Sequence, residues 1–269
     1  MKCFKSYYLD EPLQNGRVFD VFDAEDGVEA REYAFFFVHG GGWRFGSRQG
    51  GTHILIDELT RRGYTCATTD YRLKGTTAFD QISDIREALD AFVDLLVKAE
   101  KEPKIIIWGE SAGAHLASLV AYAKPGEVGE KVPVLKHPEI RPVKAIFQAT
   151  PYDFLPFEGI MPQTWGTMQD IAGVPYDKDP ERYERLSLKN YIRKDNPQTF
   201  FIEAEYEHLF DSKFTRQIAL EHRKMNIDTQ WKVYERVEHG FLHDLKRKMQ
   251  IQAFEDMCLF AENKLATEF

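Results

Sequence analysis

The sequence predicts an α/β fold with a mainly parallel central sheet and helices on both of its faces. Short apolar runs alternate along the chain with longer segments of helical periodicity, which is the order of elements in such folds. The runs are almost continuously apolar, as expected for parallel strands that are covered on both faces. We expect strands at residues 33–38, 64–69, 104–108, 143–148, 199–204 and 230–234, and an antiparallel edge strand at residues 17–22.

Apolar residues at intervals of three and four predict the helices between these strands. In residues 79–98, for example, Ile82, Ile85, Leu89 and Phe92 form one apolar stripe, which is typical of a helix packed on a sheet. These side chains are expected in the core and not in a functional site. The same spacing predicts helices at residues 52–62, 79–98, 112–123, 212–225 and 244–265.

The region between residues 125 and 180 interrupts the alternation, because it contains nine of the twelve prolines. Long connections without regular strands are usually functional lids or disordered linkers. The many aromatic residues of this region favour an ordered insertion. A chain of this length often forms one α/β domain, so we expect a single domain, residues 1–269, with a cap or lid insertion at about residues 150–195.

The composition is that of a globular protein and disfavours several classes of partner. Apolar residues make up 43% of the chain and charged residues 29%, with a net charge of −8. The negative net charge disfavours nucleic acid as a partner. There is no run of 18 apolar residues, and no apolar signal region precedes the first acidic residues. Three scattered cysteines, Cys3, Cys66 and Cys258, are too few for a disulfide framework or a Cys-based zinc site. We therefore expect a soluble, cytoplasmic protein without a membrane partner.

The strongest chemical signal is a G-x-S-x-G motif, Gly109 to Gly113, placed between a predicted strand and a predicted helix. A strand that turns directly into a helix holds the central residue in a strained conformation, and glycines remove the collisions that side chains would cause. The motif could also be an ordinary glycine turn, but its two flanks favour a nucleophile. Ser111 is therefore the candidate nucleophile, and the amide of Ala112 at the helix N-terminus is a candidate oxyanion donor.

A second motif, His39-Gly40-Gly41-Gly42-Trp43, directly follows the strand predicted at residues 33–38. Acyl transfer needs N–H donors that point at the oxyanion, and adjacent glycines let the backbone approach the substrate. Gly41 and Gly42 are the candidate donors, whereas His39 is expected to be structural. A phosphate-binding loop is the alternative interpretation, but it fails because Ser47 stands where that motif requires lysine.

A nucleophilic serine needs a base, and the base needs an acid that orients it. His239 follows the last predicted strand, so it should lie at the same edge of the sheet as Ser111. His115 is expected to pack inside its helix, and His208 is too close to the candidate acids. His243 and Asp244 could form a metal site with His239, but the start of a helix is the simpler account of this cluster.

The acid is expected in the loop after the strand at residues 199–204. Glu207 is our first choice. Asp211 is the reserve because it precedes a helical pattern and could be the N-cap of that helix. Asp153, which follows the strand at residues 143–148, is third.

Together these motifs resemble the α/β-hydrolase superfamily, and within it the hormone-sensitive-lipase-like and bacterial carboxylesterase groups, near the feruloyl-esterase-like and kynurenine-formamidase-like branches. The resemblance covers roughly residues 30–265 and includes a D-Y-R-L segment at residues 70–73, which is expected to be a structural brace. It implies an α/β-hydrolase fold, with Ser111 as nucleophile and His239 as base. It also implies oxyanion donors at Gly41, Gly42 and Ala112.

The resemblance also shows a departure in the acid loop. Residues 197–207 are similar to a P-x-x-L-x-x-x-G-x-x-D segment of the family, but here Ala204 replaces the glycine and Glu207 replaces the aspartate. A glutamate can orient and stabilise an imidazole as an aspartate does, with one more methylene to position.

The expected function is hydrolysis of a small carboxylic ester through an acyl-enzyme, without a metal or an organic cofactor. An arylformamidase-type amide hydrolase and a non-catalytic binding module are the alternatives. A homodimer is possible. Five aromatic residues could form an apolar wall for a short acyl or aromatic group, or could equally belong to the core of the lid. These residues are Trp43, Phe45, Tyr152, Phe154 and Trp165.

Overall fold

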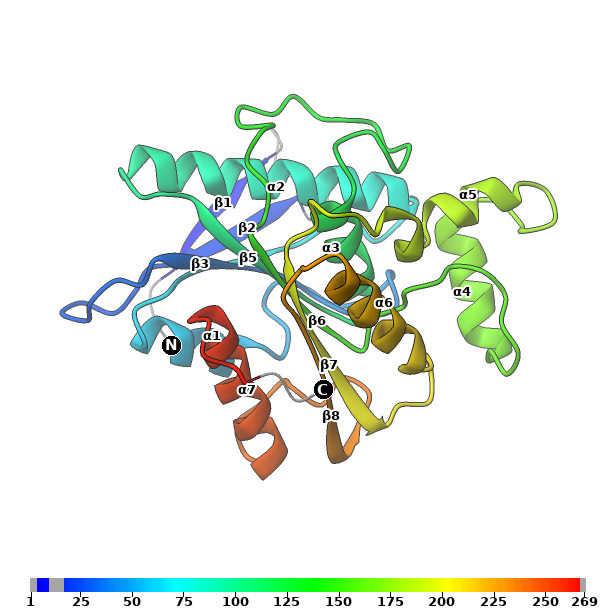
Figure 1. Cartoon of the computed structure of the whole chain (residues 1–269). Coiled ribbons are helices and arrows are strands. Elements are labelled where there is room, and N and C mark those ends of the chain that lie inside the picture. The colour runs from blue at the N-terminus through cyan, green and yellow to red at the C-terminus, as the bar shows by residue number, and fades with distance from the viewer. Residues whose placement is uncertain (1–3, 10–16, 267–269) are drawn as a thin grey trace.

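The computed structural model describes residues 4–9 and 17–266, and its centre is an eight-stranded, mostly parallel sheet (Figure 1). The strand order is β1-β2-β4-β3-β5-β6-β7-β8, and all neighbours from β4 to β8 pair in parallel. This arrangement confirms the predicted fold class. The strands are β1 (Lys5–Tyr8), β2 (Val18–Phe22), β3 (Tyr33–Val38), β4 (Thr65–Thr69), β5 (Lys104–Glu110), β6 (Lys144–Gln148), β7 (Gln198–Tyr206) and β8 (Thr229–Glu238).

The antiparallel strand predicted at residues 17–22 exists as β2, but its predicted place at the edge of the sheet is wrong. β2 pairs antiparallel with β4 on one side and with β1 on the other, so β1 forms the edge. The four residues of β1 are partly or fully exposed and contain no apolar run. A short, half-solvated edge strand therefore escapes a search for buried strands.

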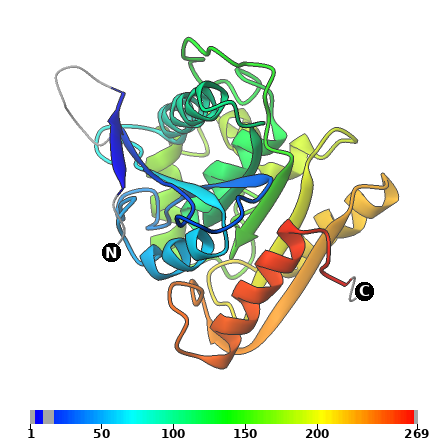
Figure 2. The same ribbon diagram turned by 90° about the vertical axis from the view of Figure 1, so that its left-hand side faces the viewer.

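Two helical layers enclose the sheet (Figures 1 and 2). Alternate residues of β3 point to opposite faces: Phe36 packs in the core with α2 and α3, whereas Phe35 and Phe37 pack in the core with α1 and α7. Both layers consequently bury the near-continuous apolar strands that the sequence shows. The helices are α1 (His53–Arg61), α2 (Ala78–Lys98), α3 (Ala112–Tyr122), α6 (Lys213–Lys224) and α7 (Lys248–Ala261), with α6 on the side of α2 and α3.

The last helix begins at Lys248 and not at residue 244, as the sequence had predicted. Phe241 and Leu242 are buried in the core, which draws residues 240–247 into a loop before α7. The side chain of Gln250 accepts hydrogen bonds from the amides of Lys246 and Arg247 and donates one to the carbonyl of Phe241. This capping fixes the start of α7 four residues later than the apolar spacing suggests.

The segment predicted as a lid contains two helices and one 3₁₀ turn: α4 (Pro162–Ala172), α5 (Pro180–Arg185) and η1 (Leu188–Tyr191). Both helices begin with a proline, which is favourable in the first helical turn. Trp165, Tyr176 and Tyr183 contact one another edge to face or at a tilt. The aromatic residues thus order this segment from within, and they pack it on the core of α2 and α3.

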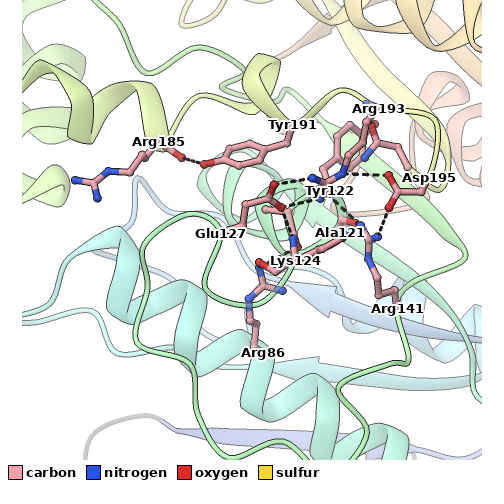
Figure 3. A network of polar contacts seen from close by, with 12 residues as sticks. Arg86, Ala121, Tyr122, Lys124, Glu127, Arg141, Arg185, Tyr191, Arg193 and Asp195 are labelled. Carbon is pink, nitrogen blue, oxygen red and sulfur yellow. Dashed lines mark hydrogen bonds and ion pairs between the residues drawn. The ribbon is translucent and has the colours of Figure 1, made fainter.

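Helix α3, which is buried along its whole length, is anchored at its C-terminus by three arginines (Figure 3). Arg86 donates to the carbonyls of Val120, Ala123 and Lys124, Arg141 to those of Ala121 and Tyr122, and Arg193 to that of Tyr122. Cations at this end complement the helix dipole and satisfy carbonyls that have no intrahelical donor. Each arginine also binds a carboxylate, so the position of α3 is fixed from the end opposite to Ser111.

Cys66 and Cys258 are buried and carry free thiols, whereas Cys3 lies outside the described residues. Within residues 4–9 and 17–266, no helix combines the length and the apolar character needed to cross a membrane.

Candidate active site

Ser111 lies at the sharp turn between β5 and α3 with a φ of 51° and a ψ of −121°. This conformation is rare for a residue with a side chain, and it persists because the surroundings enforce it. A Cβ on Gly109 would lie 2.5 Å from the carbonyl oxygen of Gly113, and a Cβ on Gly113 would lie 2.2 Å from that of Val38. Both glycines of the motif are therefore needed for the strand, the turn and the helix to pack.

Ser111, His239 and Glu207 form a hydrogen-bonded chain. Ser111 Oγ lies 2.8 Å from His239 Nε2, and His239 Nδ1 lies 2.7 Å from Glu207 Oε2. The carboxylate can only accept, so Nδ1 carries a proton and donates it to Glu207. Nε2 is then free to accept the hydroxyl proton of Ser111, which is the arrangement of a nucleophile, a base and an orienting acid.

The topology explains why three residues so distant in sequence meet. Ser111, Glu207 and His239 are each the first residue after a strand, namely β5, β7 and β8. These strands belong to the parallel part of one sheet, so their carboxyl ends lie at one edge. The alternation of strands and helices therefore brings the three side chains together.

Glu207 is held as a carboxylate. Its side chain is only 3% exposed, and burial alone would raise its pKa. The hydrogen bond and charge of His239, together with backbone N–H donors that include Leu209 at 2.8 Å, outweigh burial and lower the pKa of Glu207. The negative charge opposite the imidazole is consequently present at neutral pH.

The other two candidate acids contact different partners. Asp211 accepts a hydrogen bond from the amide of Lys213 at the start of α6. Asp153 accepts hydrogen bonds from Lys189 and Ser187 in the lid segment. Of the three carboxylates weighed from the sequence, the structure pairs only Glu207 with His239.

The glycine motif after β3 lies against Ser111. A Cβ on Gly40 would come within 3.4 Å of the Cβ of Ser111, and Gly41, with a φ of 117°, has no room for a side chain because Phe45 O would be 2.2 Å away. The hydroxyl of Tyr71 donates to the carbonyl of His39 and holds the start of the loop. The amide of Ala112 has no intrahelical acceptor at the first helical position, so it is available to a bound anion.

The five aromatic residues considered for the substrate wall occupy different environments. Trp43 and Phe154 are buried and pack around His115, which accepts a hydrogen bond from Trp43 Nε1 and donates one to the carbonyl of Leu186. Tyr152 is buried against Phe214, and Trp165 packs within the lid segment. Only Phe45 is widely open to solvent, with 76% of its surface exposed.

His115 and Trp43 thus connect the glycine loop to the lid segment and do not take part in the hydrogen-bonded chain. Burial lowers the pKa of His115 to about 4, so its ring is neutral at physiological pH. His208, although exposed, has its ring 6.3 Å from that of His239. His243 and Asp244 bind backbone groups of their own loop. Across the described parts of the chain, no three His, Cys, Asp or Glu side chains gather as a metal site.

Two carboxyls near this site, the partly buried Glu110 and the buried Glu203, were missed from the sequence. The Glu110 side chain reaches Gly240, where an added Cβ would lie 2.8 Å from Oε1, and burial raises the pKa of Glu110. Glu203, in the middle of β7, is buried, and Thr215 donates a hydrogen bond to it at 2.7 Å. In the sequence, Glu203 could have been noticed only as a charged residue inside an otherwise apolar predicted strand.

Glu203 makes the stability of the fold depend on pH. Burial, with a smaller contribution from the charge of Glu207, raises the pKa of Glu203 from 4.5 to about 8 despite the hydrogen bond from Thr215. Between these pH values unfolding releases a proton, so the stability supplied by the neutral carboxyl is full below pH 4.5 and is lost as the pH rises through 8.

We expect Glu203→Gln, which cannot ionise, to match the wild type at pH 4 and to exceed its free energy of unfolding by about 2–4 kcal/mol at pH 8. Urea denaturation at both pH values measures the difference. A difference that is the same at pH 4 and pH 8 would contradict this interpretation.

One protein-family model matches the segments that build this site. The BD-FAE family model matches residues 20–219, which contain the glycine loop, the serine turn and Glu207. The chain belongs to the BD-FAE family.

Solved esterases share the fold of this BD-FAE protein. The apo form of Thermogutta terrifontis esterase 2 is 19% identical, with a TM-score of 0.76 over 98% of this chain and 96% of that one. Esterase B from Lactobacillus Rhamnosis (HN001) is 16% identical, with a TM-score of 0.80 over 97% and 85% of the two chains.

Sequence relatives match over a shorter stretch. A probable carboxylic ester hydrolase, LipM, of Mycobacterium tuberculosis is 34% identical over 88 residues, which are 32% of this chain and 20% of that protein. Bovine arylacetamide deacetylase is 38% identical over 107 residues, or 38% of this chain and 27% of the relative. The matched stretches thus span about a quarter of the length of these relatives.

Proposed function

We propose that this BD-FAE protein is a serine hydrolase of small carboxylic esters. The observation that carries the proposal is the hydrogen-bonded chain from Ser111 Oγ through His239 to Glu207, with distances of 2.8 and 2.7 Å. The first distance lies in the range in which a base removes the proton of a nucleophile, and the second is a hydrogen bond that orients the base. The strained turn presents the hydroxyl, and the glycine loop lies beside it.

In the first half of the reaction Ser111 Oγ attacks the ester carbonyl while His239 Nε2 takes the hydroxyl proton. The amides of Gly41, Gly42 and Ala112 bind the developing oxyanion, an effect worth roughly 10²–10³ in rate per donor in a well-studied protease. His239 then gives the proton to the leaving alcohol as the ester C–O bond breaks. Ser111 remains acylated.

The second half repeats these steps with water. His239 takes a proton from the water, which attacks the acyl-enzyme carbonyl, and returns it to Ser111 Oγ as the acid leaves. Glu207 keeps its charge throughout and stabilises the imidazolium in both halves. All groups required for this cycle are side chains or amides of the chain itself.

The relatives support esters as the substrate class and also favour a second candidate. LipM is described as a probable carboxylic ester hydrolase, whereas the rabbit relative, 36% identical over 92 residues, is an arylacetamide deacetylase. An amide hydrolase would use the same three side chains and differ in the pocket. A non-catalytic binding module is the third possibility, but binding alone does not require the hydrogen bonds that join Ser111, His239 and Glu207.

A panel of three substrates tests the proposal. We expect the wild type to hydrolyse p-nitrophenyl acetate and p-nitrophenyl butyrate with a kcat/KM at least ten times that for N-formylaniline. A reversed ratio would favour the amide hydrolase. Absence of turnover on all three by folded protein would favour the binding module.

Glu207→Gln tests the assignment of the acid. The amide cannot supply the charge opposite the imidazolium and can donate to Nδ1, which favours the wrong tautomer, so we expect kcat to fall roughly 10²–10⁴-fold. Asp211→Asn is the matched control and should keep kcat within about two-fold, because Asp211 binds Lys213 and not His239. If Asp211→Asn lost activity while Glu207→Gln kept it, the assignment would be wrong.

A further inference from the structure

A cavity of about 480 Å³ lies beside the glycine loop, at the carboxyl edge of the sheet. Its walls come from residues 46–47, which end the glycine loop after β3, and residues 70–76, which follow β4. β3 and β4 are neighbours in the sheet, and β5, which carries Ser111, lies on the other side of β3. No step of the proposed mechanism uses this cavity.

The cavity is close to the nucleophile. A Cβ on Gly46 would lie 2.4 Å from the carbonyl oxygen of Gly40, and Gly40 in turn contacts Ser111. One turn of the glycine loop therefore separates the cavity wall from the reacting hydroxyl.

Among the described residues, the charges around the cavity leave one cation without a counter-ion. Asp70 accepts hydrogen bonds from the amide and the guanidinium of Arg48. Arg72 binds Asp84 through Nε and Nη2. Lys74 is exposed, and no described residue forms an ion pair or a hydrogen bond with its ammonium group. In a protein with a net charge of −8, this positive lining is distinctive.

Two side chains fix the shape of the cavity relative to the catalytic loop. Arg44 Nη1 donates to the carbonyls of Leu73 and Thr76, and the same guanidinium binds Asp170 of α4. Gln81 Nε2 donates to the carbonyls of Trp43 and Arg72. The loop of Lys74 is therefore joined to the glycine loop by several hydrogen bonds, and a group bound there is held at a defined place relative to Ser111.

We propose that this cavity is a substrate subsite that binds a carboxylate carried by the ester, through Lys74 with Ser47 and Arg72 beside it. This inference rests on the proposed ester hydrolysis and names its substrate class as anionic esters. One ammonium group that no described carboxylate neutralises matches one carboxylate of the substrate. A hydrogen bond between two such groups is stronger than a neutral one.

Two matched pairs of esters test the proposal, because the carboxylate can lie on either side of the ester bond. One pair is 4-acetoxybenzoate and phenyl acetate, and the other is phenyl hydrogen succinate and phenyl butyrate. We expect the wild type to prefer the anionic member of at least one pair. Lys74→Ala should lower kcat/KM for that ester about 5–10-fold, and Lys74→Glu should lower it further.

The controls separate a subsite from a general change of the enzyme. Turnover of the neutral esters should stay within two-fold in both Lys74 variants. Lys131→Ala, at an exposed lysine in the connection between α3 and β6, should change neither member of a pair. The preference for the anionic ester should also shrink as ionic strength rises. Equal effects of Lys74→Ala on neutral and anionic esters, or no effect on either, would overturn the subsite.

A binding measurement keeps this test distinct from failure of the proposed function. Calorimetric titration of 4-hydroxybenzoate and succinate into Ser111→Ala requires no turnover. If the wild type hydrolysed none of the four esters, the proposed ester hydrolysis would be wrong. The titration alone would then test whether the cavity binds a carboxylate. Binding that is lost in Ser111→Ala/Lys74→Ala would support the subsite, whereas equal or absent binding in both proteins would refute it.

Discussion

Replacing Ser111 by alanine should lower kcat for p-nitrophenyl butyrate by at least 10⁴-fold, while the protein stays folded. In the proposed mechanism the hydroxyl oxygen bonds to the acyl group, and neither Thr nor Cys stands at the turn to replace it. Loss of a nucleophile in a hydrogen-bonded triad removes the covalent route, and only binding and the oxyanion donors still assist attack by water. The rate is measured under saturating ester with protein purified from a strain lacking contaminating esterases.

Ser212→Ala is the matched control, since Ser212 lies at the N-terminus of α6 and outside the hydrogen-bonded chain. Its kcat should equal that of the wild type within about two-fold. Circular dichroism of both variants checks the fold, and we expect no loss of helix in Ser111→Ala, because alanine can accept the turn with modest strain. Retention of one tenth of wild-type kcat by Ser111→Ala would refute the acyl-enzyme route.

Gly113→Ala should damage stability and catalysis together. The added Cβ would lie 2.2 Å from the carbonyl oxygen of Val38 and 2.3 Å from that of His39, both backbone atoms that cannot rotate away. Overpacking of this kind costs about 3 kcal/mol or more, because the end of β3 must move. The glycine loop follows that end, so the proposed oxyanion donors move with it. We expect kcat/KM to fall at least 100-fold.

Gly166→Ala provides the opposite control. Gly166 lies in α4, and an added Cβ would meet nothing within 4 Å. Alanine in an open helical position stabilises a protein by about 0.5–1 kcal/mol, since it lowers the conformational entropy of the unfolded chain. Urea denaturation should show a lower midpoint for Gly113→Ala and a higher one for Gly166→Ala. Equal midpoints for both variants would contradict the steric account of the serine turn.

The positions of Ser111, Glu207 and His239 could be predicted because each depends on a local pattern. Each residue directly follows a strand in the parallel part of the sheet, and parallel strands end at a common edge. The choice between Glu207 and Asp211 depended on which side chain serves the backbone at the start of the next helix. Asp211 does accept a hydrogen bond from the Lys213 amide there, but the N-cap of α6 is Ser212 and not Asp211 as predicted.

Features that depend on tertiary packing could not be predicted in this way. The aromatic residues Trp43 and Phe154 look suited to a pocket wall, but they are buried in contact with His115 of α3. The start of α7 depends on burial of Phe241, which the helical spacing does not reveal. The exposed edge strand β1 has no apolar run that a search for core strands would find.

Labelling with a fluorophosphonate probe tests the central claim, an activated Ser111, most directly. Organophosphates modify a solved structure of the same fold, Thermogutta terrifontis esterase 2, which is phosphonylated by sarin. Intact-protein mass spectrometry of wild type, Ser111→Ala and Ser212→Ala gives the number of labels, and a peptide map gives the site. The account predicts one label on Ser111 in wild type and Ser212→Ala, and none in Ser111→Ala. Undiminished labelling of Ser111→Ala, or no labelling of folded wild type, would contradict it.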